Sequence, residues 1–408
     1  MVKLLCSLIL FLSCAPLSAT ISRAFDASAF VYQDTKPTPP WGQCKREEES
    51  IDPNLYHSQP WDQMDSGTCY AASSAALIYS YWREINPKAR PPSAAYLAFQ
   101  TQLQFRVPVV LNLTWGHTKP NKIGAWLQQG SLVETTTFFS LRRPLIPLEA
   151  LIGPKERNEA VIINALQQLL PIFERQDPST INIPEIIQNM NLLPNTSRDK
   201  LIELAKDLLV FLSKPDHWIK QPLTEKIFYQ RTLLTFFRHR FASETISPKD
   251  LPSLRIKIMN TKAQYTSFLA NELLHHPRPW IISVHSRTLS HSAKVSKIRT
   301  YFPSLHAVTA YGYRCRQGKI EFLIRNSWGG PAMRDLTLGK VKPTPKIYRG
   351  DFWIEASLLA SYTAKGFLGS LISLTNPARK ETQKEDSQMV LSNSQERHGA
   401  NFYRIEGP

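Results

Sequence analysis

The apolar positions in the first third of the chain recur at a helical period. From Cys69 to Arg83 the sequence is rich in Ala, Leu and Ile, and positions three and four apart share a face, which predicts a helix that prolines then close. A second helix is expected over 93–104 and a short third one over 123–129, while the pattern over 132–139 predicts a strand. Residues 40–140 are therefore interpreted as a mainly helical unit.

Residues 141–250 change character and carry amphipathic stripes of their own. Asn158 is a candidate N-cap for a helix from Glu159 to Leu170, which Pro171 is expected to stop. A second helix is expected from Ser197 and a third from Leu223 to Phe241. A linker would not carry such stripes, so this segment is predicted to be a helical insertion.

Short apolar runs dominate residues 251–375 and predict strands. After a helix over 265–274, strands are expected at 279–284, 307–313, 320–324 and 352–354, the last of which would be a short last strand of the chain. Residues 376–408 are polar, charge-balanced and poor in apolar runs, which predicts a disordered tail. The whole pattern indicates an α+β fold.

The N-terminus has the layout of a signal peptide. Lys3 precedes a mostly apolar run that is too short to span a bilayer, and small residues follow it. Residues 1–19 are expected to be removed, with cleavage after Ala19 or as late as Ala24. Cys14 lies in a loose lipobox-like sequence, so lipoprotein anchoring is the lesser alternative. Export predicts an oxidising location: secreted or periplasmic, or lysosomal or extracellular in a eukaryote.

Three cysteines remain after such a cleavage, namely Cys44, Cys69 and Cys315. If Cys69 is a nucleophile, the other two either form a disulfide or stay as free buried thiols. The sequence leaves both alternatives open.

Positive charge is concentrated in one part of the chain. The formal net charge is +16, and residues 251–375 alone hold 18 Lys and Arg against 5 Asp and Glu. This excess indicates either a solvated basic face or an acidic partner, whether a polyanion, a membrane surface or an acidic substrate. Nucleic-acid binding is not expected, because no nucleic-acid motif accompanies the charge. The chain is expected to be a monomer.

Three residues far apart in the sequence predict a thiol hydrolase. Cys69 opens an apolar helix, whose dipole would favour the thiolate that such chemistry needs. His306 precedes an apolar strand and would take the thiol proton and later return it to the leaving amine. Asn326 would hold the imidazole in a productive orientation.

Two further residues complete this arrangement. Gln63, six residues before Cys69, can place its side-chain N–H beside the Cys69 backbone N–H to form an oxyanion hole. Trp328 can cover the hydrogen bond between the imidazole and the amide. The chemistry calls for no cofactor and no metal.

These motifs, in this order, resemble those of the papain-like cysteine peptidases. The matching runs are Gln63 followed by Gly67-Thr68-Cys69-Tyr70-Ala71, then His306-Ala307-Val308, then Asn326-Ser327-Trp328-Gly329. The resemblance covers roughly 40–140 and 251–375, with weaker matches at 123–137, 279–284 and 350–354, the last as the closing strand. It implies two subdomains, one helical and one a β-barrel-like sheet, with the Cys and the His on opposite walls of a cleft. It also implies the same four roles for Cys69, His306, Asn326 and Gln63.

The spacing of the motifs agrees with an insertion. His306 follows Cys69 by 237 positions, whereas the family spacing is about 130–150. The excess of about 100 residues matches the helical block at 141–250. The family's disulfide Cys is replaced by Ser66, and its substrate-binding segment is absent. Trp115-Gly116-His117 is the candidate substitute in substrate binding, and the family's long propeptide does not fit before Gln63.

The sequence therefore predicts an exported cysteine peptidase that hydrolyses polypeptides through an acyl-enzyme on Cys69. Two alternatives are a cell-wall peptide hydrolase, which would suit the basic charge, and a catalytically silent homologue that binds peptides. The insertion at 141–250 is expected to act as a spacer, an exosite, a lid or a docking surface.

Overall fold

The structure is a computed structural model. It describes residues 42–58, 61, 68–105, 137, 140–141, 145–152, 159–190, 192, 198–214, 225–242, 252–259, 261–285, 305–327, 351–361, 363 and 370–375. The expected signal peptide with Cys14 and the expected tail at 376–408 lie outside these ranges. Within them, no helix is both long and apolar enough to cross a membrane.

The described residues form helices and an antiparallel sheet, so the fold is α+β as predicted. The helices are α3 (Pro53–Tyr56), α4 (Cys69–Ile85), α5 (Ala94–Phe105), α8 (Leu148–Leu151), α9 (Glu159–Arg175), the 3-10 helix η4 (Pro178–Thr180), α10 (Ile183–Asn189), α11 (Arg198–Leu212), α12 (Glu225–Arg240), α13 (Lys262–His275) and α15 (Ala356–Ser361). The strands are β1 (Glu48–Ile51), β2 (Ser253–Lys257), β3 (Trp280–His285), β4 (Leu305–Arg316), β5 (Lys319–Arg325), β6 (Asp351–Glu355) and β7 (Leu371–Thr375).

The sheet has the order β2-β7-β3-β4-β5-β6, and β1 pairs with β4 off this path. Strand β4 is long enough to pair β3 along its first half and β1 along its second half, with β5 on its other edge. The register slips between Ala310 and Gly312, where these two partners meet. In the described ranges the sheet is not closed, because no pairing joins β2 to β6. The barrel-like subdomain is therefore an open sheet there.

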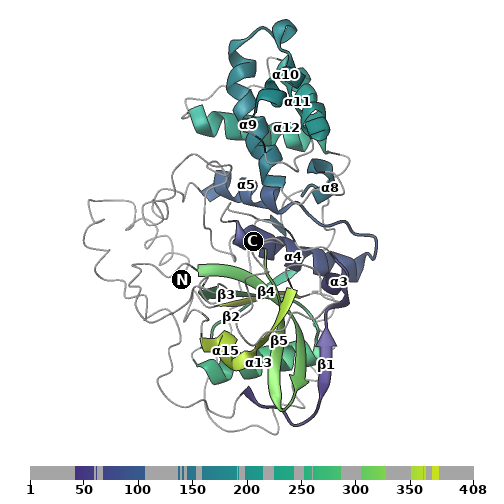
Figure 1. Cartoon of the computed structure of the whole chain (residues 1–408), viewed down its shortest axis with the longest axis vertical. Coiled ribbons are helices and arrows are strands. Elements are labelled where there is room, and N and C mark those ends of the chain that lie inside the picture. Colours follow the sequence, from purple (N-terminus) through teal and green to yellow (C-terminus); the bar gives the residue numbers. More distant parts are fainter. Residues whose placement is uncertain are drawn as a thin grey trace, which may run out of the picture.

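Alternate residues of β4 face two different cores. Ala307 and Tyr311 belong to the core that also holds the side chains of α4. Val308 and Ala310 belong to the core that holds those of α13. This period of two follows from the pleat of a strand. The sheet is thus covered by α4 on one face and by α13 on the other (Figure 1).

Helix α4 is buried nearly all round, from Tyr70 to Trp82. Its Ala and Ser residues are small, so the helix fits between the sheet and α5. This burial holds the first residue of the helix, Cys69, at a fixed place against β4.

A disulfide joins Cys44 to Cys315, with their Cα atoms 5.9 Å apart. Of the two alternatives that the sequence left open, the structure has the paired one. The bond ties the segment before β1 to β4, next to the backbone hydrogen bond from Cys44 N to Gly318 O of 3.0 Å.

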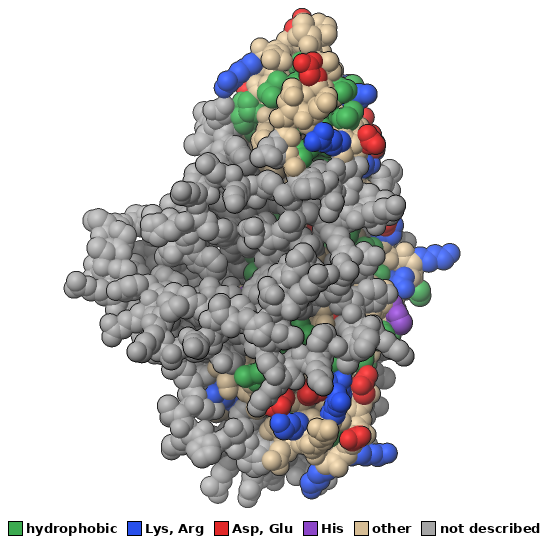
Figure 2. Space-filling model, viewed as in Figure 1, with side chains coloured by type: hydrophobic (Ala, Val, Ile, Leu, Met, Phe, Trp, Pro, Cys, Tyr) green, Lys and Arg blue, Asp and Glu red, His purple; other side chains and the backbone are tan. Residues whose placement is uncertain are grey.

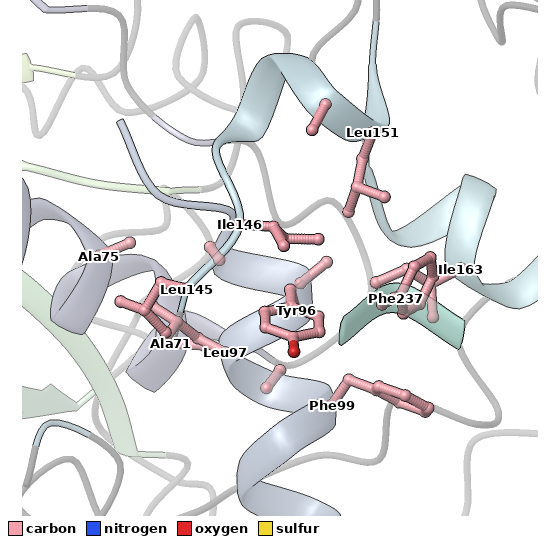
Figure 3. Close-up of a cluster of buried hydrophobic side chains, with 14 of the residues drawn as sticks. Ala71, Ala75, Tyr96, Leu97, Phe99, Leu145, Ile146, Leu151, Ile163 and Phe237 are labelled. Atoms are coloured by element: carbon pink, nitrogen blue, oxygen red, sulfur yellow. The ribbon is translucent and has the colours of Figure 1, made fainter. Parts of the chain in front are cut away.

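The helices α9 to α12 project from the body at the top of Figure 1. Their hydrophobic core is nevertheless continuous with that of α4 and α5. Phe237 of α12 lies against Tyr96 and Phe99 of α5, with ring centroids 5.9 and 6.3 Å apart (Figure 3). The helical block and the helix that begins at Cys69 therefore share one core.

Three expectations about individual elements were wrong. Helix α9 runs through Pro171 to Arg175, because buried Phe173 continues its apolar face beyond the proline. Thr137, the described residue of the expected strand at 132–139, is helical. The strand at 352–354 is β6, and it is not the last strand along the chain, because β7 follows it and pairs with both β2 and β3.

Candidate active site

Cys69 is the first residue of α4 and the single free cysteine among the described residues. It is half-buried, and Thr68 precedes it as the N-cap without a side-chain hydrogen bond to the helix. The N–H groups of the first turn and the positive end of the helix dipole therefore lie at the thiol.

The Cys69 thiol lies against the backbone of β4 at Ala307, the residue that follows His306 in the chain. Burial is the largest influence and raises the pKa of Cys69, while hydrogen bonds from the backbone N–H groups of Ala307 and Tyr70 oppose it. The net effect is a raised pKa. The helix-terminal thiolate expected from the sequence is therefore opposed by desolvation, and the resting group is a neutral thiol.

His306 and Asn326 form a buried hydrogen-bonded pair. The ring Nε2 of His306 lies 2.6 Å from the side-chain Oδ1 of Asn326. Strand β4 carries His306 opposite Val284 of β3, and Asn326 directly follows the end of β5. Both side chains are at most 3% exposed. The two strands thus bring together residues 20 positions apart.

The buried position also sets the charge of the imidazole. Burial lowers the pKa of His306 to about 4, while the hydrogen bond with Asn326 opposes this change. The ring is therefore neutral near pH 7. Because the amide oxygen accepts at Nε2, the proton sits on Nε2, and Nδ1 is left as the ring nitrogen that can accept a proton.

A small cavity lies between α4 and the strands, and it is lined by the two chain neighbours of Asn326. Its lining also includes Ser73 and Ala76 of α4 and Thr309 of β4. The full set is Trp61, Ala72, Ser73, Ala76, Thr309, Arg325 and Ser327. Sequence reasoning did not single out Arg325, although a charged residue at the end of an apolar strand was a visible signal.

Several predicted site residues lie outside the described ranges. They are Gln63, Trp115, Gly116, His117 and Trp328. The structure brings His306 and Asn326 into contact and places the Cys69 thiol at the backbone of Ala307, the residue after His306. The other five stay predictions. No cluster of three or more His, Cys, Asp or Glu that could hold a metal occurs in the part of the chain that the structure describes.

No protein-family profile matches the sequence, and no curated protein matches it. Solved structures show a distant likeness. A digestive procathepsin L2 proteinase from the larval midgut of Tenebrio molitor is 13% identical, with 84% of this chain and 69% of that chain covered and a TM-score of 0.36.

Two other solved structures are similar at the same level. A Carica candamarcensis cysteine protease in complex with E-64 is 10% identical, with 80% of this chain and 98% of that chain covered and a TM-score of 0.35. A structure concerning the mite allergens Blo t 1 and Der p 1 is 11% identical, with 88% and 82% covered and a TM-score of 0.37. Likeness at this level carries no conclusion about chemistry, which depends on the residues described above.

Proposed function

We propose that this chain is a papain-like cysteine peptidase that cleaves polypeptides through an acyl-enzyme on Cys69. One observation carries the proposal. A thiol at a buried helix N-terminus lies against the strand residue next to His306, and His306 is itself held by Asn326 at 2.6 Å. The proposed nucleophile thus lies beside the strand that carries the proposed base, and the base is hydrogen-bonded to the proposed orienting group, which supports a catalytic triad.

The first half of the reaction would form the acyl-enzyme. Nδ1 of His306 takes the thiol proton while the sulfur of Cys69 attacks the peptide carbonyl carbon. Asn326 accepts from Nε2–H throughout, which favours the imidazolium. The developing oxyanion would be met by the backbone N–H of Cys69 and the side chain of Gln63. The imidazolium then gives its proton to the leaving amine.

The second half would regenerate the enzyme. His306 takes a proton from water, which attacks the thioester and releases the acid, and the sulfur recovers its proton. The resting pair is neutral, because burial raises the pKa of the thiol and lowers the pKa of the imidazole. Proton transfer therefore belongs to the attack step and not to the free enzyme.

Localisation and partners are part of the same proposal. The disulfide between Cys44 and Cys315 supports an oxidising, extracellular-type location. An acidic partner finds less support, because basic residues described in 251–375 form ion pairs with acids. These pairs are Arg255–Glu272, Arg278–Glu84, Arg314–Glu321, Lys319–Glu355 and Arg325–Asp351.

The visible surface agrees with the ion pairs, because its basic side chains lie among acidic ones. Figure 2 shows Lys and Arg interspersed with Asp and Glu at the lower end of the molecule. An acidic partner would therefore depend mainly on 286–304, 328–350 and 364–369, which together hold ten Lys and Arg against one Asp.

The test is turnover of a peptide library by purified wild type and variants. Cys69→Ala should abolish turnover, and Asn326→Ala should lower kcat about 100-fold, because the imidazole loses its acceptor. His275→Ala is the matched control, since His275 is an exposed histidine at the end of α13. Turnover by Cys69→Ala at the wild-type rate would contradict the proposed role of Cys69.

A further inference from the structure

Arg325 is the last residue of β5 and the immediate neighbour of Asn326. It lies directly opposite Asp351 of β6 on one side and Thr309 of β4 on the other. Its side chain is only 3% exposed, and that of Asp351 only 1%. A full cation and its counter-ion are therefore buried one residue away from the proposed orienting amide.

The guanidinium of Arg325 is held at several points. Nε and Nη2 donate to the two carboxylate oxygens of Asp351 at 2.9 and 2.8 Å. Nη1 donates to Ser58 Oγ at 2.5 Å, and Nη2 also donates to the carbonyls of Leu55 and Ser58 at 2.7 and 3.2 Å. The ring of Tyr311 lies 5.1 Å from the guanidinium carbon. Because the guanidinium is planar and its nitrogens donate to several fixed acceptors, the side chain has essentially one orientation.

These contacts connect the two parts of the proposed site. Ser58 closes the turn after α3, and from there the chain leads to Cys69. Asp52, which caps α3, also accepts a hydrogen bond from Ser80 of α4 at 2.5 Å. Arg325 thus joins the strand that presents Asn326 to the segment that precedes the helix of the thiol.

The chain connection from Arg325 to Asn326 explains how the contacts of Arg325 affect the imidazole of His306. Leu323 packs in the core of α4, and Arg325 lines the cavity beside α4. Asn326 comes next in the chain, and its side chain meets His306. Because Asn326 directly follows Arg325, fixing Arg325 also fixes the backbone from which the Asn326 side chain leaves.

Stability alone is a weak reason for such a pair. Burying two charges costs desolvation energy, and well-packed apolar residues often serve stability equally well. We propose that Arg325, locked by Asp351, is a positioning residue that sets the place of Asn326 and through it the tautomer and orientation of His306. This inference rests on the proposed function and assigns no contact with substrate to Arg325.

The test replaces the pair without leaving a lone buried charge. Arg325→Met combined with Asp351→Leu keeps the site filled, and Arg325→Lys keeps the charge but loses the fork. The matched control is Lys319→Met with Glu355→Leu, an exposed ion pair of 2.8 Å between the same two strands. Each protein is assayed for kcat and KM, for its unfolding midpoint, and for the ring 15N shifts of His306 at pH 7.

We expect both Arg325 variants to lower kcat about 10- to 100-fold with KM little changed, as for other small misplacements of reacting groups. The 15N shifts should move from a single tautomer towards a mixture, and the control pair should change neither quantity. Wild-type kcat and shifts in a folded double variant would overturn the proposal. The proposal would also be overturned if the fall in kcat of Arg325→Lys were fully explained by a smaller fraction of folded protein. The 15N shifts need no activity, so an inactive wild type would refute the peptidase and leave the positioning test intact.

Discussion

Glu159 provides a sharp test of the energetics that join the helical block to the body. It is the first residue of α9, it is only 3% exposed, and its Oε1 accepts from the backbone N–H of Ala95 in α5 at 2.9 Å. Its Oε2 is buried without a hydrogen-bond partner in the structure as described. Burial raises the pKa of Glu159 to about 7, against opposing hydrogen bonds from Ser93, Ala95 and Ala94.

The sign and size of the effect follow from that pKa. The folded protein holds the Glu159 proton up to about pH 7, whereas the unfolded chain releases it near 4.5. Stability from this group is therefore fully present below pH 4.5 and is lost as the pH rises through 7. The rise of the pKa from 4.5 to about 7 corresponds to about 3 kcal/mol of unfolding free energy.

The assay compares urea unfolding of wild type and Glu159→Gln at pH 4.5, 6 and 8. Glutamine keeps the acceptor oxygen for Ala95 but cannot ionise. The variant should match wild type at pH 4.5 and be more stable by about 3 kcal/mol at pH 8. The exposed carboxylate of Glu185 in α10 gives the control variant, Glu185→Gln. A difference between wild type and Glu159→Gln that does not grow with pH would show that Glu159 is not held protonated in the folded protein.

Two more predictions concern the sheet. Replacing Cys44 and Cys315 by Ser should lower the unfolding free energy by about 2–5 kcal/mol, because the bond closes a loop with a sequence separation of 271; an unchanged guanidinium midpoint would contradict this. Gly312→Ala should cost about 1–3 kcal/mol, since a Cβ there would lie 2.9 Å from Leu323 Cβ and 3.3 Å from Ile51 Cγ1. Thermal unfolding measures this loss of stability, and a midpoint equal to that of wild type would show that the strands accommodate the added Cβ without destabilisation.

The site could be predicted from sequence where chemistry demands particular residue types in order. A Cys that opens an apolar helix, a His before an apolar strand and an Asn after another strand predicted the contact between His306 and Asn326, which is present at 2.6 Å. The protonation state of Cys69 could not be predicted in the same way. It depends on burial, which raises the pKa of the thiol, and burial is decided by the whole core.

The fold was predictable where local patterns agree with packing. Helix α4 and the central strands are such cases, whereas a local proline rule misplaced the end of α9, since Pro171 sits in a helix that packing extends. The pair of Arg325 and Asp351 was hidden because its members are 26 residues apart and meet only through strand register. Cysteine spacing likewise left the disulfide undecided, because pairing is fixed by the fold.

The pairing of β1 with β4 joins an early and a late part of the chain, which affects folding during synthesis. Residues 48–51 find their strand partners only at 312–315. At typical rates of synthesis of about 5–20 residues per second, the first strand emerges roughly 10–50 s before its partner exists. During that interval its backbone groups are an unpaired edge, and the charged run Glu47-Glu48-Glu49 keeps such an edge from joining other nascent chains. The N-terminal strand is therefore the part of this sheet that must wait longest to fold.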